Sequence, residues 1–126
     1  MIGLAALHAD RLMFALGADA DRIAWGMGIA RSARAAAGLD PEGIVFGAYV
    51  NCVCHPAIEI ARDLVKGGLT TFARFSVMHG TVEGPASSQT RDALKAMHDA
   101  YDMRAHTRGD SPQARTLSAE FIDHFA

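Results

Sequence analysis

The residues best suited to chemistry lie in two parts of the sequence, and the first is the pair Gly17-Ala18. The pair follows a short apolar run and precedes an acidic, helix-forming segment. Free backbone amides at the start of a helix can bind an anion such as phosphate. A tight turn between a strand and a helix requires the same small residues, so a purely structural role stays open. Gly17 and Ala18 are therefore candidate cofactor-binding residues.

The second part combines the end of a strand-like segment at Asn51 with the later run Arg74 to Gly80. Arg74 could hold a phosphate or a carboxylate through two parallel hydrogen bonds. His79 is the candidate catalytic residue, because an imidazole can act as acid or base near neutral pH, or hydrogen-bond a ligand. Asn51, Arg74 and Ser76 join the candidate cofactor-binding residues.

A structural alternative for the second part stays open. In it, Arg74 forms an ion pair with Asp63 or Glu83, while Phe72 and Phe75 pack a helix against the core. No nucleophile elbow, phosphate loop or dinucleotide fingerprint is present to favour another chemistry. His8, His98, His106 and His124 are widely spaced and are interpreted as helix-surface or loop residues.

The run Cys52-Val53-Cys54-His55 resembles a cluster of metal ligands. No second Cys or His pair lies at the spacing of a zinc site, so we predict no metal. Alternate residues of a strand point to the same face, too far apart for a comfortable disulfide. Reduced cysteines in a buried strand predict a cytoplasmic protein.

Composition limits the class of protein. The chain has 126 residues, half of them hydrophobic, which is enough for one domain with a real core. Its net charge of −2 and the lack of a polybasic block argue against a nucleic-acid partner. No run approaches the roughly 18 apolar residues that cross a bilayer, so no membrane partner is expected. The N-terminus lacks the positive charge of a secretory signal, which again favours an intracellular protein.

Two apolar segments, 12–16 and 44–54, are predicted to be strands, and the second is apolar enough to be buried. Such strands belong in a parallel sheet that helices cover. Helices are predicted at residues 2–9 and at about 19–37. A third runs from about 57 up to the segment that begins at 73, a fourth covers 87–106, and the last begins at 112. Gly67-Gly68 predicts a break, a kink or a close packing contact in the third of these. The fold class is thus α/β and mostly helical, with two parallel strands and four or five helices.

Four stretches, residues 9–19, 37–43, 47–51 and 73–80, resemble the luciferase-like monooxygenase superfamily. The branch that they resemble most comprises deazaflavin-dependent oxidoreductases, relatives of methylenetetrahydromethanopterin reductase. The resemblance covers nearly all of the chain, and its most specific part is Ala-Arg-Phe-Ser-Val-Met-His-Gly at 73–80.

The resemblance implies a TIM (β/α)8 barrel that uses a reduced flavin or deazaflavin. Segments 12–16 and 44–54 would be its sixth and seventh strands, and the other strands have no counterpart here. Residues 1–126 are therefore predicted to be a single partial domain, the C-terminal portion of such a barrel. The intact relative would transfer hydride between a deazaflavin coenzyme, or alternatively FMN, and a small organic substrate. Gly17 and Ala18 match the turn that faces the phosphate-bearing end of ligands.

An alternative of another class is a non-catalytic helical interaction module, or an oligomerising remnant of the barrel. In either case two strands without neighbours expose backbone donors and acceptors, and such edges recruit other chains. We therefore expect a homo-oligomer, and no catalytic turnover from the isolated chain.

Overall fold

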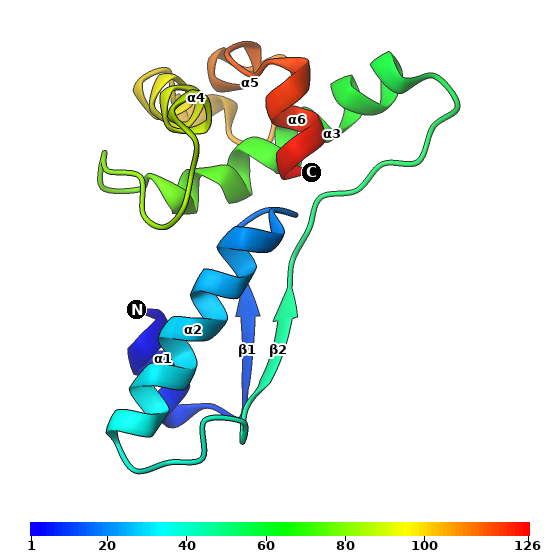
Figure 1. Ribbon diagram of the computed structural model, residues 1–126. Coiled ribbons are helices and arrows are strands. Elements are labelled where there is room, and N and C mark those ends of the chain that lie inside the picture. The colour runs from blue at the N-terminus through cyan, green and yellow to red at the C-terminus, as the bar shows by residue number, and fades with distance from the viewer.

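The computed structural model describes residues 1–126 as an α/β protein, mostly helical, with six α-helices and two parallel strands. Figure 1 shows two layers. The lower layer consists of α1 (Ile2–His8), β1 (Arg11–Phe14), α2 (Ala20–Ala36) and β2 (Val45–Ala48). The upper layer consists of α3 (Ile58–Ala73), α4 (Ser88–Asp99), α5 (Pro112–Arg115) and α6 (Ala119–Phe125), with 3-10 turns at Arg74–Ser76 and Met103–Ala105.

The lower layer is one strand–helix–strand unit. β1 and β2 pair in parallel with α2 as the crossover, as the sequence predicts, and Leu12 lies opposite Phe46. The rings of Phe14 and Phe46 stack with their centroids 5.7 Å apart. Phe14 also packs on Gly26 of α2, where a Cβ atom would meet its ring at 3.1 Å. A small core of Ala6, Ala30 and Ile44, with Leu12 and Phe46 packed on it, joins α1 and α2 to the sheet.

The opposite face of the sheet, formed by Arg11, Met13, Val45, Gly47 and Tyr49, has no covering element; we call it the open face. The exposed fraction is 43% for Met13, 54% for Val45 and 55% for Tyr49. Within it the Met13 thioether lies on Gly47, and at its carboxyl end the Tyr49 ring lies 6.1 Å from the ring of Phe72 in α3, centre to centre. A parallel sheet is normally covered on both faces, so the open face departs from the usual arrangement.

Both strands end earlier than predicted. β1 stops at Phe14 because Gly17, with φ +83°, turns the chain away. The Tyr49 amide makes the last bond between the strands, to the Phe14 carbonyl, so β2 has no partner beyond that point. The chain from 49 to 57 then runs without regular structure to α3 (Figure 1). As a result Cys52 and Cys54 are exposed, and the prediction that they are buried in a strand is wrong.

The upper layer contains the larger core, built from α3, α4, α6 and the loops beside them. Its members are Val65, Leu69, Ala73, Val77, Leu94, Met97, Leu117, Phe121, Ile122 and Phe125. Leu94 and Met97 form the buried face of α4, and Phe121 and Phe125 belong to that of α6. On α3, Ala61 and Val65 are buried, whereas Ile58 is 56% exposed.

Three helix predictions need refinement. The segment expected as one C-terminal helix is divided, because the Ser118 hydroxyl accepts the Phe121 amide and starts α6. The helix predicted over 87–106 ends at Asp99. α3 continues through Gly67-Gly68, where close packing replaces a break: a Cβ atom on Gly67 would overlap the Thr107 carbonyl oxygen, and one on Gly68 would overlap the Asn51 side chain. No helix of the protein is long and apolar enough to cross a membrane.

A bidentate ion pair joins α3 to α6 and predicts a pH effect. Arg62 donates from Nε and Nη2 to the two carboxylate oxygens of Asp123, at 2.9 and 2.6 Å. These bonds hold the pKa of Asp123 below its ordinary value. Because the folded-state pKa is the lower one, the pair contributes stability above the unfolded-state pKa and loses it as pH falls through the folded-state value.

We therefore expect Asp123→Asn to lower the melting temperature at neutral pH and to reduce the loss of stability on acidification. Thermal unfolding followed from pH 7 to pH 2 measures both effects. Asp92→Asn serves as the control, since Asp92 is an exposed α4 residue with no bonded side-chain partner. Parallel pH curves for wild type and Asp123→Asn would show that the ion pair does not contribute.

Candidate functional site

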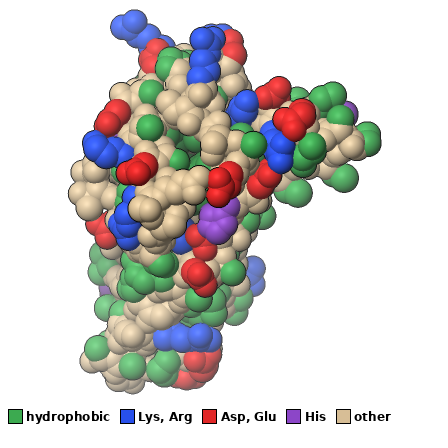
Figure 2. Space-filling model, turned by 45° about the horizontal axis from the view of Figure 1, so that its top comes forward, with side chains coloured by type: hydrophobic (Ala, Val, Ile, Leu, Met, Phe, Trp, Pro, Cys, Tyr) green, Lys and Arg blue, Asp and Glu red, His purple; other side chains and the backbone are tan.

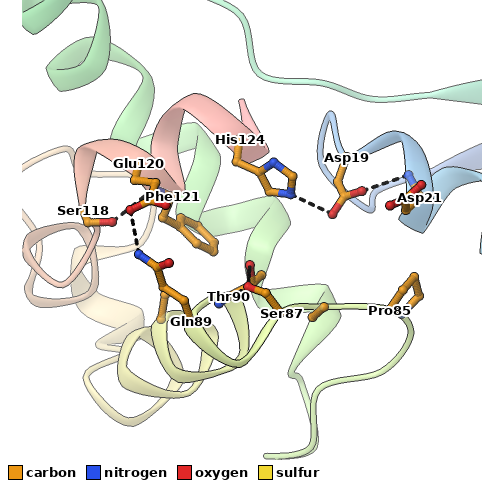
Figure 3. A pocket seen from close by; sticks show the side chains of 12 residues that line it. Asp19, Asp21, Pro85, Ser87, Gln89, Thr90, Ser118, Glu120, Phe121 and His124 are labelled. Atoms are coloured by element: carbon orange, nitrogen blue, oxygen red, sulfur yellow. Dashed lines mark hydrogen bonds and ion pairs between the residues drawn. The ribbon is translucent and has the colours of Figure 1, made fainter.

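A hollow of about 520 Å³ lies between the two layers, beyond the carboxyl end of β1 (Figure 3). Ligands of open α/β sheets bind at this end of the strands. The lining is mostly polar and comprises Asp19, Asp21, Pro85, Ala86, Ser87, Gln89, Thr90, Ala93, Ser118, Glu120, Phe121 and His124. With three carboxylates and no lysine or arginine among these residues, we call it the acidic hollow.

Three helices begin at the rim of the acidic hollow, and each has a side-chain cap. Asp19 Oδ1 accepts the Asp21 amide at 2.9 Å and the Arg22 amide at 3.2 Å. Ser87 caps α4 and Ser118 caps α6 in the same manner. Asp and Ser are among the residues most favoured at helix N-caps. Because the caps satisfy end amides of each helix, and the lining is acidic, the hollow suits a neutral or cationic group rather than a phosphate.

The closest approach to a catalytic arrangement in the acidic hollow is the pair Asp19 and His124. His124 Nε2 lies 3.0 Å from Asp19 Oδ2, and Figure 3 shows the two side chains pointing toward each other. Asp19 is 8% exposed, whereas the His124 side chain is 54% exposed. A buried carboxylate that orients an accessible imidazole can support proton transfer. No activated nucleophile accompanies it, because the nearby Ser87 hydroxyl is bonded to Thr90.

A buried arginine behind the hollow holds the two layers together. Arg22 is fully buried and donates to the carbonyls of Glu83 and Pro85, both at 2.7 Å. Its guanidinium lies 6.0 Å from the centre of the Phe125 ring. Burial lowers the pKa of Arg22, and the negative charge of Asp19 partly opposes that shift.

Sequence reasoning did not identify Arg22 or His124 as important. Their partners lie 61 and 63 residues away for Arg22 and 105 residues away for His124. No local pattern encodes a contact between such distant positions, so there was no signal to find.

The predicted anion-binding turn is occupied by the C-terminal helix. Gly17 is buried against the Phe125 ring, and a Cβ atom there would overlap the ring carbons. The Ala18 amide donates to the Phe125 carbonyl at 3.0 Å. In this structure the turn therefore anchors α6, and the Ala18 amide is not available to a phosphate.

The other predicted site residues follow α3 or pack against it. Asn51 is half-buried against Gly68 and lines a second hollow of about 340 Å³ between α3 and α6. Ser76 is 2% exposed, and its hydroxyl has no partner in the protein. Arg74 lies over the Tyr101 ring, 5.0 Å from its centre. His79 is exposed in the turn that follows the first 3-10 segment.

The structure thus does not bring the predicted residues into one site. Asn51 alone among them lines either of these two hollows. Arg74 and Ser76 share the short 3-10 turn with one residue between them, and Gly17 and Ala18 are at the other layer. Arg74 also lacks the ion pair with Asp63 or Glu83 that the structural alternative required, since Asp63 binds Lys66 instead.

No group of three His, Cys, Asp or Glu side chains is placed to hold a metal ion. Comparisons of the chain with known protein families, with curated proteins and with solved structures found no match.

Proposed function

We propose that the chain is part of a luciferase-like α/β barrel that transfers hydride between a deazaflavin, or FMN, and a small organic substrate. The observation that supports this most is the open face of the sheet. Met13, Val45 and Tyr49 are apolar or aromatic and about half exposed, as expected of a barrel segment whose neighbouring strands are not part of this chain.

The direction of the strands supports the same proposal. β1 and β2 both run toward the helical layer, as the arrows in Figure 1 show, and the candidate residues lie at or beyond their carboxyl ends. In (β/α)8 enzymes the active site is built at this end. The resemblance at 73–80 falls on the turn that contains Arg74 and Ser76 and on the exposed His79.

In this proposal the cofactor performs the redox chemistry, and the protein binds and orients it. Asn51 and Arg74 contact the cofactor, and His79 donates or accepts a proton. Ser76, Gly17 and Ala18 are assigned to the cofactor by the resemblance alone, since Ser76 is buried and the Gly17-Ala18 turn packs against Phe125 in this chain. Because these residues lie apart in the chain alone, the preorganised geometry of catalysis depends on the remaining barrel. The intact protein would work in the cytoplasm on a small molecule, and the isolated chain would form a homo-oligomer.

A cofactor titration tests the proposal. We expect the isolated chain to give no turnover but a saturable change in the fluorescence of deazaflavin or FMN at millimolar concentration, where weak complexes form. Asn51→Ala should weaken the change, and Gln89→Ala, which alters an amide in the acidic hollow, should not. No saturable change with either cofactor would contradict the proposal. Deazaflavin reduction at ordinary enzyme rates would contradict the expectation of an inactive chain.

A non-catalytic interaction module is the second candidate, and a separate surface favours it. At the start of α3 the exposed fraction is 56% for Ile58, 47% for Ile60 and 63% for Leu64. Figure 2 shows hydrophobic side chains gathered on the projecting end of the molecule, with charges of both signs scattered elsewhere. Exposed apolar groups on this scale are typical of interaction surfaces. This candidate predicts no response to either cofactor.

A further inference from the structure

Arg74 differs from the other arginines of the chain in its surroundings. It is partly buried, yet its guanidinium has no hydrogen bond or ion pair within the protein. The other arginines of intermediate burial, Arg31, Arg34 and Arg62, all have bonded partners. Arg11 and Arg104 also lack side-chain partners, but both are exposed. Arg74 is thus held at the protein surface with its hydrogen-bond donors unused.

The position of the guanidinium is fixed by an aromatic ring. Its central carbon lies 5.0 Å from the centre of the Tyr101 ring. Tyr101 is itself held by a hydrogen bond between its hydroxyl and His106 Nδ1, at 2.8 Å. Stacking on an aromatic ring occupies one face of a guanidinium and leaves the N–H groups at its edge free. Such a preorganised fork matches the two oxygens of a carboxylate or phosphate.

No carboxylate of the chain forms an ion pair with Arg74, including Glu83, whose backbone amide donates to the Ser76 carbonyl at 3.0 Å. Asp63 pairs with Lys66 at 2.6 Å, and Asp99 pairs with Lys95 at 3.1 Å. Asp102 accepts the Arg104 amide at 2.8 Å. The positive charge of Arg74 is therefore available to a group from outside the chain.

We propose that Arg74, held on Tyr101, binds an oxyanion group of a ligand, a phosphate or a carboxylate. Arg74 supplies two parallel N–H donors, and Tyr101 is a positioning residue that keeps the fork in place. This site is separate from the acidic hollow, whose charge excludes an anion. It does not depend on the chain being an oxidoreductase, so it can hold even if the flavin titration fails.

Titration with inorganic phosphate and with acetate, at constant ionic strength kept with chloride, tests the site by following backbone amide resonances. We expect saturable shifts around residues 74–80 and 101 with millimolar affinity, weakened about tenfold by Arg74→Lys, which keeps the charge but loses the fork. Arg104→Lys is the matched control and should leave the affinity unchanged. Tighter binding of phosphate assigns a phosphate-bearing ligand, and tighter binding of acetate assigns a carboxylate.

The role of Tyr101 is checked in the same titration. Tyr101→Leu should weaken binding, and Tyr101→Phe, which keeps the ring, should restore most of it. The proposal is overturned if no saturable shift occurs, or if Arg74→Lys and Arg104→Lys have equal effects, since both results would leave Arg74 as a packing group. Equal affinities for Tyr101→Leu and wild type would overturn the positioning role.

Discussion

Replacing Arg22 with alanine is expected to lower the free energy of unfolding by about 3–5 kcal/mol, as breaking a buried charged network does. The side chain is fully buried and bonds to two carbonyls of the loop that closes the acidic hollow, those of Glu83 and Pro85. Its removal leaves both carbonyls without these partners and opens space beside Phe125. Denaturation by urea, followed by circular dichroism, measures the loss.

Arg91→Ala is the matched control for this prediction. Arg91 donates to the same loop, to the carbonyls of Val82 and Gly84, but at 3.3 and 3.2 Å and from an exposed position. Its replacement should cost about 0.5 kcal/mol, as for a typical surface residue. Equal losses for the two variants would show that burial of Arg22 does not give it a special role in joining the layers.

Gly67→Ala is expected to destabilise the protein by about 1–3 kcal/mol, the usual cost of overpacking. The change improves helix propensity by up to about 1 kcal/mol, but the new methyl group would overlap the Thr107 carbonyl oxygen. Since that atom belongs to the backbone, the loop after the second 3-10 turn must move. Urea denaturation measures the net effect.

Gly28→Ala provides a control of opposite sign. Gly28 is also inside a helix, α2, but no atom lies within 4 Å of a Cβ built on it. The substitution should therefore raise the free energy of unfolding by up to about 1 kcal/mol. If Gly67→Ala stabilises the protein as Gly28→Ala does, the contact between α3 and Thr107 is not important for the fold.

The helix caps and the pair Gly67-Gly68 show what the sequence can and cannot predict. Helix starts are encoded locally, because Asp19, Ser87 and Ser111 are residue types that favour N-caps and each caps a helix. The glycine pair in α3 has a helix cost that is visible locally. The reason that both positions require glycine is the close approach of Thr107 and Asn51, which depends on packing between distant segments. From the sequence alone, a break, a kink and close packing are all compatible with the pair. The structure shows close packing.

The early end of β2 likewise depends on a contact between distant segments. Periodicity predicts an apolar strand through Cys54, but a strand extends only as far as its partner. β1 ends at Phe14, next to a turn held by Phe125 from the other end of the chain. The exposure of Cys52 and Cys54 is a consequence of that distant contact. The candidate site is affected likewise: residue types suggested Arg74, while its stacking on Tyr101 and the pairing of Asp19 with His124 required the folded chain.

Sedimentation velocity at micromolar concentration tests most directly the central proposal, that the two strands lack their barrel neighbours and the isolated chain therefore associates with a second copy through the open face. A symmetric dimer can cover the strand edges and the apolar face together. The account predicts a dimer for the wild-type chain and a monomer for Val45→Lys, which places a second positive charge on that face, opposite Arg11. A wild-type monomer that unfolds cooperatively would contradict it, because the two strands would then be stable without further cover.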